Sequence, residues 1–137
     1  MYTEDFIPVV LGDIPRKNAA LRGPDVAVHF EGRETTFMDF DRYTNQVANG
    51  LTAMGIEPQT HIAYLGKNSD LYFELLYGAA KARVILAPVN WRLAPPEIAY
   101  IINDCGAEIL FVGPEFVDGL RAFAGEHPRD RGPKPLR

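Results

Sequence analysis

Apolar residues recur along this chain with two spacings, and the two spacings alternate. Intervals of three and four residues, which place side chains on one face of a helix, alternate with short apolar runs typical of strands. We expect helices over residues 36–54, 69–82, 95–105 and 115–124, separated by strands over residues 61–65, 84–88 and 109–112. Because helices and strands alternate through short connections, the pattern predicts an α/β fold with a mostly parallel sheet and flanking helices.

A short helix and a hairpin are predicted ahead of this alternation. Asp13 and Pro15 are typical of a helix start, so we expect Asp13 to cap a helix that ends near Arg22. Residues 26–30 and 33–37 predict two strands, joined by a tight turn into an N-terminal hairpin.

Helix ends are marked by residues of the expected kinds. Thr36, with Asp39 three residues later, resembles a capping box, and Ser69 can cap the next helix. Gly55 and Gly106 follow helical stretches, where a left-handed backbone commonly ends a helix.

Two of these helices carry apolar stripes that we assign to the core. The stripes consist of Phe40, Tyr43, Val47, Leu51 and Met54, and of Leu71, Leu75 and Leu76. The strand over residues 84–88 is apolar throughout, which is expected where helices cover both faces of a sheet.

Composition limits the class of protein. The 137 residues are 47% hydrophobic and 23% charged, which is enough apolar material for one core. A net charge of −4 argues against a nucleic-acid partner. No apolar run approaches the roughly 20 residues of a membrane span, and no basic signal segment begins the chain, so we expect no membrane span and a cytoplasmic protein. Cys105 is the only cysteine, so a disulfide framework is excluded, and we expect this residue in the core.

Residues 127–137 depart from the pattern of the rest. They contain three prolines and four basic residues without apolar periodicity. We therefore expect one domain over residues 1–126, followed by a disordered or frameshifted tail over residues 127–137.

Residues with catalytic potential form no recognisable set. No glycine-rich dinucleotide motif occurs, and the Gly-Lys pair at residues 66–67 lacks the other residues of a phosphate loop. His29, His61 and His127 lack metal-ligand spacing, and we expect structural roles for them. The sequence thus predicts no catalytic, cofactor-binding or metal-binding residue.

Three polar residues lie at predicted strand ends, where α/β proteins place their ligands. They are Asn68, Asn90 and Arg92. We expect turn and cap roles for them, with ligand contact as the alternative.

Three segments resemble those of AMP-forming acyl-CoA ligases, which belong to the adenylate-forming superfamily. Residues 35–40 resemble the Leu-Thr-Tyr-x-Glu-Leu segment near the start of these enzymes. Residues 80–90 resemble their block Lys-Ala-Gly-Ala-x-x-x-Pro-x-Asn, and residues 90–97 resemble the Val-Asn-x-Arg-Leu…Glu run of fatty-acyl-CoA ligases. Their order and spacing extend the resemblance over residues 6–128.

The resemblance implies part of the large domain of an adenylate-forming enzyme. Such an enzyme uses ATP, Mg and CoA to convert a small-molecule carboxylate into an acyl-CoA, with release of AMP and pyrophosphate. This chain ends before the family's phosphate loop, so the resemblance implies a truncated or frameshifted ligase that is inactive alone and binds none of these cofactors. Its expected partner is the missing remainder of the ligase.

Two other interpretations remain open. The chain could be a stand-alone interaction module, or one half of a split enzyme, that reuses the ligase scaffold. An unrelated receiver-like α/β domain is the third interpretation, although the acidic cluster that it requires is not evident. In a ligase fragment, open sheet edges would also favour self-association.

Arg83 departs from the resemblance. The family has glycine at this position, just after a helix, where the backbone is commonly left-handed. We therefore predict that Arg83 is strained and that Arg83→Gly raises stability.

Overall fold

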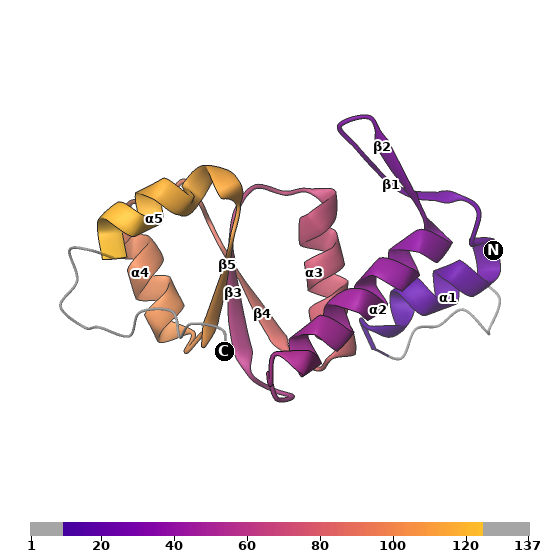
Figure 1. The fold of residues 1–137 in the computed structure, drawn as a ribbon, viewed down its shortest axis with the longest axis horizontal. Helices are drawn as coiled ribbons and strands as arrows, with labels where there is room; N and C mark the ends of the chain where they lie inside the picture. Colours follow the sequence, from indigo (N-terminus) through magenta and orange to yellow (C-terminus); the bar gives the residue numbers. More distant parts are fainter. Residues whose placement is uncertain (1–9, 125–137) are drawn as a thin grey trace. The chain divides into compact units, whose positions relative to one another are not determined.

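The computed structural model describes residues 10–124, which form two compact units (Figure 1). The first unit comprises residues 10–60 and 68–85, and the second comprises residues 61–67 and 86–124. The predicted tail and its boundary at residue 126 lie outside the described residues.

The first unit combines helices with a two-stranded hairpin. Its elements are α1 (Asp13–Arg22), β1 (Val26–Phe30), β2 (Arg33–Thr36), α2 (Phe37–Ala53) and α3 (Asp70–Lys81). Helix α2 packs against both α1 and α3. The hairpin is antiparallel, with Phe30 opposite Arg33 and Val28 opposite Thr35, and the register is irregular between Val26 and Val28.

The second unit contains a three-stranded sheet. Its elements are β3 (His61–Leu65), β4 (Ile85–Val89, whose first residue belongs to the first unit), α4 (Pro95–Asp104), β5 (Ile109–Val112), the 3-10 turn η2 (Pro114–Phe116) and α5 (Val117–Ala124). The strand order is β4-β3-β5, and β3 runs parallel to β5, with Ile62 opposite Ile109 and Leu65 opposite Val112. This parallel pairing, together with the helices and the hairpin, confirms the predicted α/β class.

Hydroxyl caps begin two of the helices as predicted. The Thr36 hydroxyl oxygen accepts a hydrogen bond from the Asp39 N–H at 3.1 Å, and the hydroxyl donates to the Asp39 carboxylate at 3.0 Å. The Ser69 hydroxyl oxygen accepts from the Tyr72 N–H at 3.1 Å. Because each cap satisfies a backbone donor that the first helical turn leaves free, these boundaries could be read from local sequence.

The predicted cap of α1 is wrong by one residue. Gly12 is the N-cap and makes no side-chain bond, whereas Asp13 is the first helical residue. Asp13 accepts a hydrogen bond from the Val10 N–H and forms an ion pair with Arg16 at 3.1 Å. A carboxylate in the first turn also faces the positive end of the helix dipole, which explains why both positions suit aspartate.

The core of the first unit follows the predicted stripes only in part. Phe40, Leu51 and Leu75 are buried. Met54 is 44% exposed because it lies at the C-cap of α2, where the chain leaves the packed face. Leu71, in the first turn of α3, is 67% exposed, since no described residue covers it, and its assignment to the core was wrong.

The core of the second unit lies at the sheet. Ala63, Leu65 and Val89 are buried, and residues of α4 and α5 such as Ile98 and Leu120 pack against them. The prediction that helices cover both faces of the fourth strand is wrong at its start, where Ile85 is 39% exposed in the described part of the chain. No described helix has the length and apolar character needed to cross a bilayer.

Left-handed backbone occurs at the predicted helix ends. Gly55 has φ +78° and Gly106 has φ +66°. Arg83 has φ +62°, two residues after the last residue of α3, so the position where the related family has glycine is left-handed in this chain as well.

Candidate functional site

The candidate site lies in the second unit, at the carboxyl ends of the strands of the sheet. Strand β3 is followed by Gly66 and Lys67, β4 by Asn90, and β5 by Gly113. The Ile85 N–H donates to the Thr60 carbonyl at 2.9 Å, so β4 and β3 begin beside each other. In parallel sheets the carboxyl ends of the strands are the edge at which ligands bind.

Two cationic side chains lie beside the Trp91 ring at this edge. The Lys67 Nζ lies 5.4 Å from the centroid of the indole ring, and the Arg92 Cζ lies 4.9 Å from it. The indole is half-buried and contacts the Phe116 ring at 5.7 Å between centroids, whereas Lys67 and Arg92 are exposed. Attraction between each cation and the face of the indole holds both positive charges beside one ring, with their polar ends available to an anion.

The backbone that carries Lys67 is fixed by its neighbours. The Tyr64 hydroxyl donates to the Lys67 carbonyl at 2.8 Å, and the Gly113 N–H donates to the Leu65 carbonyl at 2.8 Å. A Cβ atom added at Gly66 would lie 2.4 Å from the Tyr64 hydroxyl oxygen. Glycine therefore suits the position between the strand and Lys67, because a side chain there would displace the tyrosine ring that closes the turn.

The three residues predicted at strand ends have different surroundings. The Asn90 Oδ1 accepts a hydrogen bond from the Arg92 N–H at 3.0 Å, so this amide closes a turn and supports the backbone beneath Arg92. Arg92 belongs to the cluster on Trp91. Asn68 is exposed just before the cap of α3, and its ligand contact stays a prediction.

Sequence reasoning missed Lys67 and Trp91. Lys67 was considered only as part of a phosphate loop, and nothing in the local pattern links it to an indole 24 residues later. The signal that was available is the position of both residues directly after apolar strands, which predicts that they share one edge of a parallel sheet.

Other reactive side chains lie apart from this cluster. Within residues 10–124, no group of three or more His, Cys, Asp or Glu side chains could hold a metal ion. His29 and His61 are exposed, and the half-buried Cys105 thiol donates to the Ile102 carbonyl at 3.4 Å.

One ionisable side chain of the first unit has a perturbed pKa. Burial raises the pKa of the Glu74 carboxyl, the neighbouring Asp70 raises it further, and Arg33 opposes both effects. Arg33 meanwhile makes a bidentate pair with Asp70, with N···O distances of 2.9 and 3.0 Å, and so joins the hairpin to α3.

The parallel sheet with its helices places the chain among α/β proteins, and comparison with known proteins identifies its family. The family described as AMP-binding enzyme matches residues 15–134, and the chain belongs to this family. This confirms the resemblance to AMP-forming acyl-CoA ligases.

Individual relatives are ligases of the same kind. The chain is 46% identical over 90 residues to the fatty acid–[acyl-carrier-protein] ligase ScoC of Streptomyces coeruleorubidus. This match covers 66% of this chain and 17% of that protein. It is 34% identical over 114 residues to a feruloyl-CoA synthase of an Amycolatopsis species, and this match covers 83% of this chain and 23% of that protein. The crystal structure of the N-terminal domain of FACL13 from Mycobacterium tuberculosis matches 82% of this chain and 30% of that domain, with a TM-score of 0.75 and 30% identity. The chain thus spans about a fifth of the length of these curated relatives.

Proposed function

We propose that the chain supplies the early part of the large domain of an AMP-forming acyl ligase. The complete enzyme would join a carboxylate to AMP with release of pyrophosphate, and then transfer the acyl group to the thiol of CoA or of a carrier protein. The match to the AMP-binding family over residues 15–134 carries this proposal. The named activities of the relatives, a fatty acid–carrier-protein ligase and a feruloyl-CoA synthase, support the reaction class.

The chain by itself would not carry out the first step. Transfer of the AMP group requires a metal and fixed donors around the reacting phosphate. The match covers about a fifth of the relatives' lengths. ATP, Mg and CoA would therefore be bound by an assembly that includes further ligase segments. A reaction that consumes ATP and CoA fits a cytoplasmic location.

Within that assembly, the cluster on Trp91 would contact a phosphate-bearing ligand. Lys67 and Arg92 place two positive charges beside one half-buried ring at the strand ends. Phosphate groups occur in both ATP and CoA, so the cluster suits either ligand. Asn90 would act indirectly, by holding the turn that carries Arg92.

A chimera tests whether this chain is a ligase segment. The matched part of the Amycolatopsis feruloyl-CoA synthase would be replaced by this chain, and ATP–pyrophosphate exchange would be measured. We expect exchange in the chimera and none in the chain alone. An insoluble or inactive chimera, beside an active parent enzyme handled in the same way, would count against the proposal, and so would exchange by the chain alone.

The same chimera tests the proposed role of the cluster on Trp91. Arg92→Gln should raise the KM for ATP or for CoA and thereby show which phosphate the cluster contacts. Arg42→Gln is the matched control, because Arg42 is exposed on α2 of the first unit and pairs with Asp39. If Arg92→Gln and Arg42→Gln have equal KM values, Arg92 does not contact the ligand.

Mixing the chain with the remaining segment of the same synthase separates the split-enzyme interpretation from the others. Exchange that appears only on mixing would favour one half of a split enzyme. Binding of the two pieces without exchange would favour an interaction module.

A further inference from the structure

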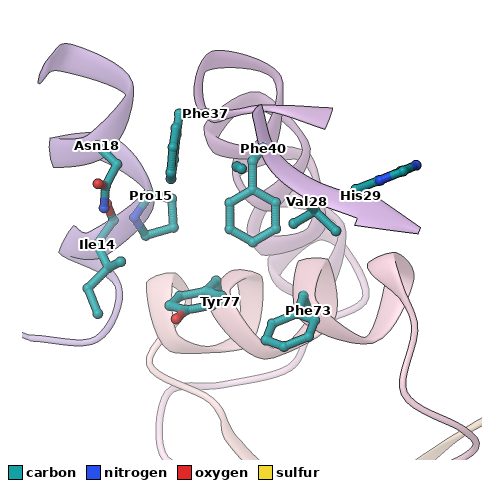
Figure 2. Close-up of a pocket in the computed structure, with 10 residues that line it drawn as sticks. Ile14, Pro15, Asn18, Val28, His29, Phe37, Phe40, Phe73 and Tyr77 are labelled. Carbon is teal, nitrogen blue, oxygen red and sulfur yellow. The ribbon is translucent and has the colours of Figure 1, made fainter. Parts of the chain in front are cut away.

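A half-open hollow of about 360 Å³ lies in the first unit and is separate from the cluster on Trp91 (Figure 2). Its walls come from α1, β1, α2 and α3. Pro15, Phe37, Phe40, Phe73 and Tyr77 supply much of the lining. Ligand pockets in proteins have volumes of about 300–1,000 Å³ and are lined mainly by apolar and aromatic side chains.

Rings at fixed angles form the inner wall of the hollow. Phe40 is 6% exposed and meets the Tyr77 ring edge to face, with 5.5 Å between centroids and 79° between planes. Phe73 is 42% exposed although it lines the same hollow, so an apolar surface at the rim faces water. A ligand that covered Phe73 would gain the free energy of removing this surface from water.

Most of the hydrogen-bonding capacity of the polar atoms around the hollow is already used. The Asn18 Nδ2 donates one of its two N–H groups to the Ile14 carbonyl, and its Oδ1 accepts from Arg22. Figure 2 shows the His29 side chain directed away from the hollow. The Tyr77 hydroxyl makes no hydrogen bond with any residue of the described part of the chain. Among the described residues that line the hollow, none carries a carboxylate or ammonium group. The neighbouring Arg22 guanidinium is bound to Asn18 and lies over the Phe37 ring, so an uncharged ligand suits the lining best.

We propose that this hollow binds a small uncharged aromatic molecule of one or two fused rings that carries a single hydrogen-bonding group. An apolar cavity of about 150 Å³ is enough for benzene, and the larger hollow therefore has room for a second ring. The ligand ring would lie against Phe40 and Phe73, and its polar atom would face the Tyr77 hydroxyl. This proposal is independent of the ligase reaction.

Indole is the probe that tests it, titrated into the full 137-residue chain and followed by NMR. We expect saturable shifts of the signals of Phe40, Phe73 and Tyr77. Benzoate, an aromatic anion, should bind more weakly than indole. Shifts that do not saturate, or equal affinities for indole and benzoate, would overturn the proposal.

A filled hollow provides the matched comparison. Ala27→Leu adds apolar volume at the lining, whereas Ala20→Leu adds the same volume at an exposed position of α1. We expect Ala27→Leu to weaken indole binding roughly tenfold or more, because a well-filled site tolerates little added volume, and Ala20→Leu to leave it unchanged. Equal affinities in the two variants would contradict the proposed site.

The role of the Tyr77 hydroxyl is tested separately, so that the conclusion does not depend on the folding of Ala27→Leu. Indene has the shape of indole but lacks its N–H donor. Tyr77→Phe should weaken indole binding about threefold to tenfold, the value of one hydrogen bond, and should leave indene binding unchanged. If both probes lose affinity equally, the proposed polar contact is wrong.

Discussion

The backbone N–H of Gln59 donates a 2.8 Å hydrogen bond to the carbonyl oxygen of Arg83, and both residues have left-handed backbone, with φ of +70° and +62°. The two loops that precede β3 and β4 are therefore joined at positions where side chains are unfavourable. The strain predicted for Arg83 from its position after a helix has a structural basis in this geometry.

Replacement of Arg83 by glycine should stabilise the protein. Arg83→Gly removes a left-handed non-glycine residue and should raise the free energy of unfolding by about 1 kcal/mol, which thermal melting would detect as a rise of a few degrees. Glu57→Gly is the control, because Glu57 is exposed in the same loop region and its φ is not positive. An unchanged or lower melting temperature for Arg83→Gly would refute the predicted strain.

Two helical glycines should respond in opposite ways to the same substitution. A Cβ at Gly78 would lie 2.4 Å from the Val47 side chain, so Gly78→Ala should separate α3 from α2 and cost about 1–3 kcal/mol. A Cβ added at Gly50 on α2 would meet nothing within 4 Å, so Gly50→Ala should gain about 0.5–1 kcal/mol. Urea unfolding of the two variants checks both signs, and a stabilised Gly78→Ala would show that the helices can move apart at little cost.

Lys81 should contribute more to stability than its surface neighbours. Its Nζ donates to the Asp41 carboxylate, to the Asp41 carbonyl at 3.3 Å and to the Asn45 Oδ1 at 2.7 Å, while its side chain is 12% exposed. Lys81→Met keeps the length of the side chain but leaves these acceptors without the ammonium, at a cost of about 1–3 kcal/mol.

Arg16→Met is the comparison for Lys81, because Arg16 pairs with Asp13 at 70% exposure of its side chain. Exposed pairs contribute roughly 0–1 kcal/mol. Similar losses in the two variants, measured by urea unfolding, would mean that burial adds nothing to the Lys81 contacts.

Glu74 should make stability depend on pH in an unusual direction for a carboxyl group. Because its pKa is raised in the folded protein, chiefly by burial and then by Asp70, the folded state holds the proton more tightly than the unfolded chain. The stabilisation by this proton is complete below the unfolded pKa and is lost as pH rises through the folded pKa. Glu74→Gln should therefore be more stable than the parent protein at neutral pH, with the difference disappearing in acid. A pH-independent difference in melting temperature would exclude this linkage.

The exposed apolar residues of α3 should favour self-association. Leu71 is 67% exposed and Phe73 is 42% exposed. Sedimentation of the isolated chain should show oligomers, and Leu71→Lys should shift the distribution toward monomer. Asn49→Lys adds the same charge at an exposed position of α2 and should have little effect. A sharp monomer for the parent chain would contradict this prediction.

Local signals predicted the order of elements well, and tertiary contacts account for what was missed. Thr36 and Ser69 could be assigned as caps because each bonds a backbone N–H only three residues away. Thr44, by contrast, is fully buried within α2, and its hydroxyl donates to the Asp41 carbonyl, so a polar residue occupies a core position that apolar spacing does not reveal.

The candidate site was less predictable than the fold for a related reason. Arg92 and Asn90 were identified by their place after a strand, but the cation pair on Trp91 also requires Lys67 from a different strand end. Such a cluster depends on the order of strands in the sheet, which the alternation of helices and strands leaves open.

The position of Pro88 in β4 affects which edge of the sheet can pair with an additional strand. Strand β4 is an edge strand in the order β4-β3-β5, and Pro88 lacks the backbone N–H that a neighbouring strand would need. Strand β5 on the opposite side contains no proline and offers an uninterrupted row of backbone groups. An additional strand would therefore extend the sheet beyond β5 more readily than beyond β4.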